Sequence, residues 1–242
     1  MTLLVVTGTG TGVGKTVVTS AIAALAIAAG RRVAVVKAAQ TGVTAGQAGD
    51  VDEVQRLAGP SVTCRELARY PEPLSPATAA RRAGLPPVTL ATATAVVREL
   101  AAVHDLVLIE GAGGLLVPLD GKGATLADIA VGSAAAVLVV TAAGLGTLNH
   151  TALTAEVLRT RGLRCVGIVI GAWPAEPDIA AQCNLSDLPA VTGLPLLGAL
   201  PADAGRLTAA EFLPVVRQGL GSGLQALGWW PLETGVTGVG SP

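Results

Sequence analysis

A glycine-rich run between two apolar segments constrains this chain more than any other feature of its sequence. The run begins at Gly8 and ends with Gly14, Lys15 and Thr16. In a turn of this kind the backbone N–H groups point inward, and the helix that follows presents its positive end. A lysine in this place reaches terminal phosphates, and a threonine hydroxyl can bind Mg²⁺. The run therefore predicts a phosphate-binding loop between a strand and a helix.

The glycine spacing of this loop departs from the strict consensus. Thr9 stands where the consensus has its first glycine, and Gly8 lies one position earlier. The dinucleotide-binding pattern G-x-G-x-x-G fits no register that starts from Gly8, Gly10 or Gly12. We therefore interpret the loop as a variant of the nucleoside-triphosphate type.

Apolar runs alternate with helical patterns along most of the chain. The apolar runs show no alternation of inward and outward side chains, which is typical of parallel strands covered by helices on both faces. We therefore expect an α/β fold: a doubly wound, mostly parallel sheet in a three-layer α/β/α domain of the P-loop NTPase type. Strands are predicted at 2–7, 32–37, 106–110, 136–141, 165–170 and 196–200, and helices at 15–29, 50–58, 88–103 and 149–161.

The sequence predicts one domain, over residues 1–218. A chain of 242 residues that is 51% hydrophobic can bury one large core. Residues 219–242 are rich in glycine and show weak periodicity, so we expect a loosely ordered C-terminal tail.

Composition disfavours several classes of partner. The chain has 16 basic and 17 acidic residues and 2% aromatic residues, so we expect neither a basic face nor a base-stacking surface for nucleic acid. The apolar stretches 21–29 and 134–140 are much shorter than the roughly 20 residues of a membrane span. No basic region precedes the first apolar run, and Cys64, Cys165 and Cys183 lack metal-ligand spacing. We expect a cytoplasmic protein with reduced thiols that binds neither membranes nor nucleic acid.

Three chemically useful side chains fall at strand ends or at the start of a helix. Lys37 and Glu110 each end an apolar strand, and parallel sheets gather ligands at the carboxyl edge of their strands. Glu110 is placed to hold Mg²⁺, directly or through water; the alternative is that it caps the glycine-rich turn that follows. Asp50 begins a helix, where an N-cap role is the plain alternative, and Lys37 taken alone is compatible with a side chain that reaches solvent.

Four motifs together resemble those of the dethiobiotin synthetases, the ATP-dependent carboxylases of biotin biosynthesis. The resemblance covers roughly residues 2–202. The motifs are the loop Gly8–Thr16, the strand-end Lys37 with Gln40-Thr41-Gly42, the turn Glu110–Gly114 and the segment Leu145–His150.

The resemblance implies an ATP-dependent ligase that forms a cyclic urea. In this family 7,8-diaminopelargonate, CO₂ (from bicarbonate) and Mg-ATP give dethiobiotin, ADP and phosphate. One amine captures CO₂ as a carbamate, and ATP phosphorylates the carbamate oxygen. The second amine then attacks the carbamic-phosphoric anhydride and closes the ring.

The resemblance also implies roles for individual residues. Lys37 would hold the carbamate anion, a role that suits a compact cation with three donors. Lys15 would bind the terminal phosphates, and Thr11 and Thr41 would position the reacting groups. The implied Mg²⁺ ligands are Thr16, Asp50 and Glu110. Further nucleotide contacts are implied at Gly12, Val13, Gly14, Val17, Gly111, Ala112, Gly113, Gly171, Ala172, Pro201, Ala202 and Asp203.

The substrate carboxylate is implied to sit on backbone amides, because neither segment that would hold it contains an arginine. In the family these two segments come from different subunits, so a homodimer with shared active sites is implied. The implied substrate contacts are Lys37, Thr41, Gly113, Gly114, Leu115, Leu116, Val117, Gly146, Thr147, Leu148 and Asn149.

One position departs from the family pattern. After the fifth predicted strand the family commonly carries an asparagine that reads the adenine edge, whereas this chain has Gly171 and Ala172. Neither residue has a side-chain amide, so we expect weak discrimination among nucleoside triphosphates. The second contact to the base is expected from the backbone of Pro201, Ala202 and Asp203.

Two other functions are alternatives at this point. A related P-loop amidoligase generally needs a glutaminase domain with a cysteine nucleophile, for which this chain has no room. A nucleotide-switch ATPase would turn over nucleotide to change conformation. The guanine-switch motif Asn-Lys-x-Asp is absent, and partitioning ATPases usually carry an additional loop lysine where this chain has threonine and glycine.

Overall fold

Seven parallel strands form the central sheet. The strands are β1 (Thr2–Gly8), β2 (Val33–Lys37), β4 (Thr63–Glu66), β6 (Leu106–Gly114), β7 (Ala136–Thr141), β8 (Cys165–Trp173) and β9 (Leu196–Pro201). In the computed structural model, which describes residues 1–228, their order is β4-β2-β6-β1-β7-β8-β9. All neighbours are paired in parallel, which confirms the fold class predicted from the apolar runs.

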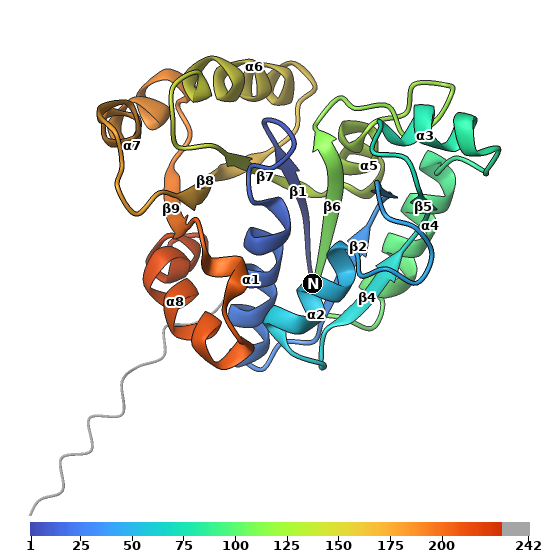
Figure 1. Cartoon of the computed structure of the whole chain (residues 1–242), viewed down its shortest axis with the longest axis horizontal. Coiled ribbons are helices and arrows are strands. Elements are labelled where there is room, and N and C mark those ends of the chain that lie inside the picture. Colours follow the sequence, from blue (N-terminus) through green and yellow to red (C-terminus); the bar gives the residue numbers. More distant parts are fainter. Residues whose placement is uncertain (229–242) are drawn as a thin grey trace, which may run out of the picture.

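Helices cover both faces of this sheet (Figure 1). They are α1 (Lys15–Ala28), α2 (Asp50–Ala58), α3 (Pro76–Ala83), α4 (Leu90–Ala101), α5 (Leu126–Ser133), α6 (Thr147–Thr160), α7 (Ile179–Thr192) and α8 (Ala209–Gln225). Apolar side chains of α1, α2 and α8 share a core with Leu4 and Val6 of β1. Those of α3, α4 and α5 pack with Val5 on the opposite face. Successive residues of β1 therefore face opposite helix layers, as the pleat of a strand requires.

The C-terminal boundary predicted at residue 218 is wrong, because it falls inside α8. Leu220 and Leu224 of this helix are fully buried, so the domain continues to at least Gln225. The glycines that suggested a loose tail serve close packing: a Cβ on Gly219 would lie 2.5 Å from the Ala199 oxygen in β9, and one on Gly223 would lie 1.9 Å from the Leu197 oxygen. The remainder of the predicted tail, 229–242, lies outside the described residues.

Several elements have no counterpart in the sequence prediction. Strand β4 is a half-buried edge strand without an apolar run. The strands β3 (Gln40–Thr41) and β5 (Arg69–Tyr70) form a separate two-stranded parallel sheet that is too short for any periodicity. Strand β6 runs beyond Glu110 to Gly114. Helices α3, α5 and α7 also went unpredicted, and α7 contains Pro189.

Candidate active site

Lys37 and Glu110 meet at the carboxyl edge of the sheet, as the strand-end rule predicts. Strands β2 and β6 are adjacent and in register at these two residues. The Lys37 Nζ lies 2.8 Å from Glu110 Oε1 and donates a hydrogen bond of 3.1 Å to the Gly111 carbonyl. Asp50, the first residue of α2, forms a second ion pair with Lys37. The ammonium group is therefore held between two carboxylates from different elements.

Two of the three charges of this cluster are almost wholly removed from solvent, whereas the Asp50 side chain is 33% exposed. The side chain of Lys37 is 4% exposed and that of Glu110 is 1% exposed. Burial by itself lowers the pKa of Lys37, but the carboxylates of Glu110 and Asp50 together outweigh it and raise the pKa above its usual value. Burial lowers the pKa of Lys15, and the positive charge of Lys37 adds to this effect. Lys37 therefore carries its charge into a buried site, while Lys15 lacks such close anionic partners.

The phosphate-binding loop, residues Gly8–Thr16, is shaped by two glycines. Gly12 and Gly14 have φ angles of 76° and 91°, which side-chain-bearing residues rarely adopt, and Gly14 caps the start of α1. The Lys15 Nζ donates a 2.8 Å hydrogen bond to the Gly10 carbonyl, so this side chain folds back over its own loop. The loop therefore lies between a strand and a helix, β1 and α1, as predicted.

Oxygen atoms gather beside Lys37 in a set that fits Mg²⁺. The Thr16 hydroxyl donates a 2.9 Å hydrogen bond to Glu110 Oε1, and the Glu110 Oε2 atom is buried without a hydrogen-bond partner. Asp50 contributes a second carboxylate. Hydroxyl and carboxylate oxygens are the donors that Mg²⁺ prefers. Among residues 1–228 no group of three or more His, Cys, Asp or Glu side chains forms a metal site, and Mg²⁺ held by one or two carboxylates usually takes water and phosphate oxygens as further ligands.

A cavity of about 830 Å³ lies over the loop and the charged cluster. Predicted site residues that line it are Thr11, Gly12, Gly14, Lys15, Thr16, Val17, Lys37, Thr41, Asp50, Ala112, Gly113 and Val117. Gln40, named above only as part of a motif, also lines the wall, as do Ala39 and the segment Pro73–Pro76, which were not predicted. This segment leads into α3, and its prolines were the available signal that the chain has an irregular path there.

The predicted base-contact residues are not among those that line this cavity. Gly171 of β8 packs against the phosphate-binding loop so closely that a Cβ there would lie 2.1 Å from the Val13 oxygen. Glycine at this position therefore has a packing reason. The neighbouring backbone is tied to β9, because Ala202 N donates a 2.8 Å hydrogen bond to the Trp173 carbonyl.

The predicted substrate segment at Gly146–Asn149 is not brought to the wall of this cavity. Thr147 is buried, and its hydroxyl bonds to Thr141 and to the Ala142 carbonyl. Asn149 instead lines a separate groove of about 240 Å³ with residues of α6 and α7. Within residues 1–228 of one chain, the two predicted substrate segments therefore do not form a single pocket.

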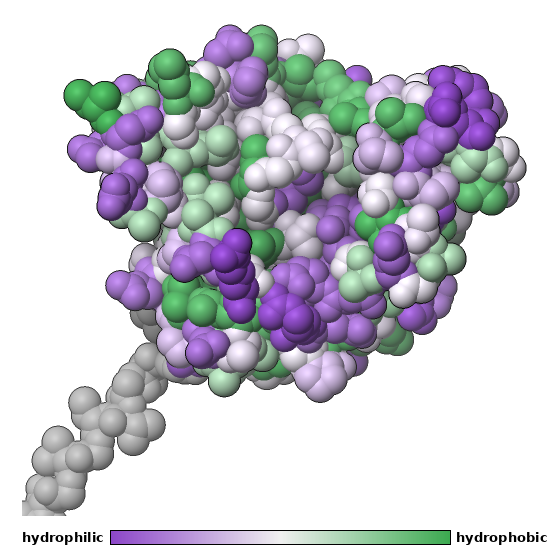
Figure 2. All heavy atoms as spheres, viewed as in Figure 1, coloured by the Kyte–Doolittle hydropathy of each residue, from purple (hydrophilic) through white to green (hydrophobic). Residues whose placement is uncertain are grey.

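The face formed by α6, α7 and the turn before α6 exposes apolar side chains. Figure 2 shows hydrophobic residues along the upper edge of the molecule, where α6 and α7 lie in Figure 1. Leu145 is 94% exposed, Ile179 80% and Leu153 58%. Leu185 and Val191 of α7 are also exposed. We refer to these five residues as the α6–α7 face.

Several known proteins with similar sequences share one name. A family model described as an AAA domain matches residues 2–207. The ATP-dependent dethiobiotin synthetase of Saccharopolyspora erythraea is 64% identical over 93% of this chain and 97% of its own length. The chain belongs to the ATP-dependent dethiobiotin synthetase family. Family enzymes from Streptomyces coelicolor and Mycobacterium bovis are 62% and 50% identical, over 89% and 92% of their own lengths.

Solved structures confirm the fold at lower identity. The cell-division ATPase MinD of Pyrococcus furiosus has a TM-score of 0.62 at 20% identity, covering 94% of this chain and all of the other. A ParA-family ATPase from Chlorobium tepidum gives 0.55 at 16%, covering 93% and 95%. At such identities the likeness shows a shared P-loop NTPase-like fold, and it adds nothing for the nucleotide-switch alternative.

Proposed function

We propose a role for each residue of this site in the reaction that the family catalyses. The protein is an ATP-dependent dethiobiotin synthetase, a ligase of biotin biosynthesis, and the ring-closing chemistry described above is its reaction. Lys37 is the observation that carries the assignment of roles. A buried, charged ammonium group on the cavity wall beside a phosphate-binding loop suits an anionic intermediate that must accept a phosphoryl group.

Lys37 holds the carbamate oxygen and stabilises the negative charge that it carries until phosphoryl transfer. In the structure its three N–H donors are directed to Glu110, Asp50 and the Gly111 carbonyl. A carbamate would take the place of one of these acceptors. Thr11 and Thr41, which line the same cavity, position the reacting groups.

The loop amides and Lys15 bind the phosphates of the nucleotide. Lys15 exchanges the Gly10 carbonyl for a phosphate oxygen, and the phosphate charge counteracts the low pKa caused by its burial. When bound, Mg²⁺ neutralises the charge that develops on the transferred group. Thr16, Asp50 and Glu110 are the side chains that would hold it, and Glu110 Oε2 is the acceptor left without a partner.

The substrate carboxylate is held at the edge where a second subunit joins. This proposal is supported by the separation of Gly146–Asn149 from the main cavity and by the exposed leucines beside it. A homodimer through the α6–α7 face would bury this apolar surface and bring the segment of one subunit to the cavity of the other. Backbone amides at the start of α6 would then bind the carboxylate.

The direct test is product formation. The protein is incubated with 7,8-diaminopelargonate, bicarbonate, Mg²⁺ and ATP, and dethiobiotin is sought by mass spectrometry. We expect a product that contains the carbonyl carbon of labelled bicarbonate and that depends on ATP and on Mg²⁺. Nucleotide hydrolysis without this product would favour the switch alternative instead.

We further propose that the enzyme works in the cytoplasm and selects its nucleotide weakly by base. Among residues 1–228 no helix has the length and apolar character to cross a membrane. Neither Gly171 nor Ala172 has a side-chain amide, and the close packing of Gly171 leaves no room for one at that position.

A further inference from the structure

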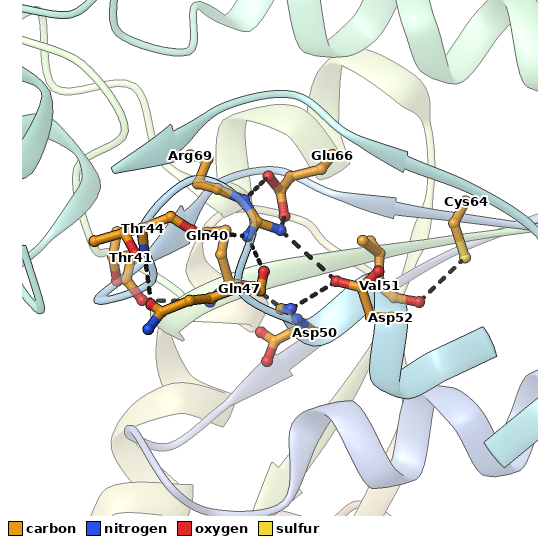
Figure 3. A network of polar contacts seen from close by, with 11 residues as sticks. Gln40, Thr41, Thr44, Gln47, Asp50, Val51, Asp52, Cys64, Glu66 and Arg69 are labelled. Carbon is orange, nitrogen blue, oxygen red and sulfur yellow. Dashed lines mark hydrogen bonds and ion pairs between the residues drawn. The ribbon is translucent and has the colours of Figure 1, made fainter. Parts of the chain in front are cut away.

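A network of polar contacts surrounds the turn that precedes Asp50 (Figure 3). This turn, residues 42–49, leads from β3 into α2. Two carbonyls of this turn, those of Thr44 and Gln47, accept hydrogen bonds from Arg69, which is not among the residues that line the cavity. The family resemblance assigned no role to this arginine.

Arg69 ties the turn to the edge of the main sheet. Its guanidinium makes a bidentate pair with Glu66, with Nε 2.6 Å from Oε1 and Nη2 2.8 Å from Oε2. Its Nη1 donates to the carbonyls of Gln47 and Thr44. Glu66 ends β4 directly beside Lys37 of β2. The carboxylate that holds Arg69 is therefore in register with Lys37. The turn is therefore fixed relative to the strand that carries Lys37.

Gln40 completes this arrangement from the cavity side. It pairs with Arg69 across the small sheet of β3 and β5, and its Oε1 accepts a 2.8 Å hydrogen bond from the Asp50 N–H. Gly49 is enclosed between these two side chains: a Cβ there would lie 2.8 Å from Arg69 Nη2 and 2.9 Å from Gln40 Oε1. The start of α2 thus has little freedom to shift.

Asp52 adds a third restraint on the same helix start. Its Oδ2 accepts a 2.6 Å hydrogen bond from the Gly49 N–H and lies 3.8 Å from Arg69 Nη2. The restraints act on the backbone on both sides of Asp50, and the carboxylate of Asp50 itself remains free to face Lys37. The network therefore fixes where the carboxylate is presented.

We propose that Arg69 and Gln40 are positioning residues that set the Asp50 carboxylate for metal binding. The proposal rests on the proposed function in one respect, the role of Asp50 as a Mg²⁺ ligand. Exposed ion pairs alone contribute little to stability, but Arg69 is 22% exposed, holds Glu66 in bidentate geometry and binds two carbonyls of the turn. Partners of metal ligands commonly affect metal affinity by about tenfold or more when they are removed.

The test measures the gain in nucleotide affinity that the metal produces. The dissociation constant of the non-hydrolysable analogue AMPPNP is determined by calorimetry with and without Mg²⁺, and the ratio of the two constants is compared among variants. A variant that only loosens the fold changes the unfolding temperature or both constants, but it leaves their ratio unchanged. Arg69→Met, Gln40→Leu and Asp50→Asn are measured, together with Arg69→Met/Asp50→Asn.

We expect Arg69→Met to reduce the ratio about tenfold, and Gln40→Leu to reduce it in the same direction. Arg69→Lys should recover part of the loss, because it keeps the charge without the fork. In the Asp50→Asn background Arg69→Met should have no additional effect, since both act on one ligand. Arg32→Met is the matched control: Arg32 makes a bidentate pair with Asp105 just before β2 and β6, at the opposite edge of the sheet from Lys37, and the variant should keep the full ratio.

Three results would overturn the proposal, and they are distinguishable. If Asp50→Asn reduces the ratio but Arg69→Met does not, then Asp50 is a ligand that needs no such support, and only the positioning role is lost. If Asp50→Asn itself keeps the full ratio, the metal role of Asp50 in the proposed function is wrong, and the positioning role falls with it. A loss in Arg69→Met that adds fully to that of Asp50→Asn would also contradict an action through Asp50.

Discussion

The charged cluster beside the cavity and the α6–α7 face differ in what they bury. The cluster buries charged side chains, and the face exposes apolar ones. In the cluster, Lys37 and Glu110 are almost fully buried, and each has a partner of opposite charge within one chain. On the α6–α7 face, Leu145 and Ile179 extend into solvent without any cover. The cost of burying charge is offset internally, whereas the exposed apolar side chains gain nothing until another surface covers them. The charged cluster is thus assembled within one chain, whereas the exposed α6–α7 face supports our proposal that the substrate carboxylate is held with the help of a second chain.

Removing the positive charge of Lys37 from the charged cluster should have the largest effect on activity. We expect Lys37→Ala to reduce dethiobiotin formation by about 10³-fold or more, because no other cation of the described cavity wall lies between the carboxylates. AMPPNP should still bind in the presence of Mg²⁺, since the loop amides and Lys15 are intact. The checks are product yield by mass spectrometry and AMPPNP affinity by calorimetry. An active Lys37→Ala enzyme would remove this lysine from the mechanism.

A charged residue introduced on the α6–α7 face should affect dimer assembly without affecting nucleotide binding. We expect Leu153→Asp to weaken the proposed dimer and to raise the KM for diaminopelargonate by about 30-fold, because an unpaired carboxylate at the centre of an interface is costly. The affinity for AMPPNP should not change. Sedimentation velocity and steady-state kinetics at several protein concentrations are the measurements.

Val103→Asp provides the matched control for this variant. Val103 is 56% exposed, close to the 58% of Leu153, but it lies just before β6, at the opposite edge of the sheet from the site. The control should assemble and turn over normally. A monomeric wild-type enzyme with full activity would contradict the proposal of shared sites, and the difference between the charged cluster and the α6–α7 face would then need another explanation.

Removing the Thr16 hydroxyl from the charged cluster should have a smaller effect. Thr16→Val keeps the shape of the side chain but removes the hydroxyl that bonds to Glu110 Oε1. We expect the Mg²⁺ concentration for half-maximal activity to rise about tenfold, with a smaller change in the KM for the nucleotide. The Mg²⁺ dependence of turnover is the measurement. An unchanged Mg²⁺ dependence would contradict the assignment of Thr16 as a ligand.

The sequence predicted those parts of the site that follow from long regular elements. Lys37 ends an apolar strand and Glu110 follows the apolar run of β6, and the parallel-sheet rule then brings both to one edge. Arg69 and Gln40 could not be predicted in this way, because their strands have two residues each and the pairing of β3 with β5 has no periodic signal.

Close backbone packing was also invisible to the sequence analysis. Gly219 and Gly223 suggested a loose tail, but they allow α8 to lie against β9. In the same way Gly171 reads as the loss of a base contact, although its absent side chain also makes room for the phosphate-binding loop. A glycine has the same letter whether it frees the backbone or admits a neighbouring one, and only the structure distinguishes the two.

The predicted base contacts at the ends of β8 and β9 should give the smallest effect of all, a weak preference among nucleotides. We expect kcat/KM values for ATP, CTP and GTP within about tenfold of one another, because strong rejection of a base requires polar groups that are left unpaired by the wrong one. Gly171 and Ala172 provide only backbone atoms for such contacts. Initial rates of dethiobiotin formation with each nucleotide at saturating Mg²⁺ are the measurement. A preference for ATP of several hundredfold would show that backbone groups near Ala202 read the adenine edge by themselves. The base site, like the charged cluster, would then be formed within one chain.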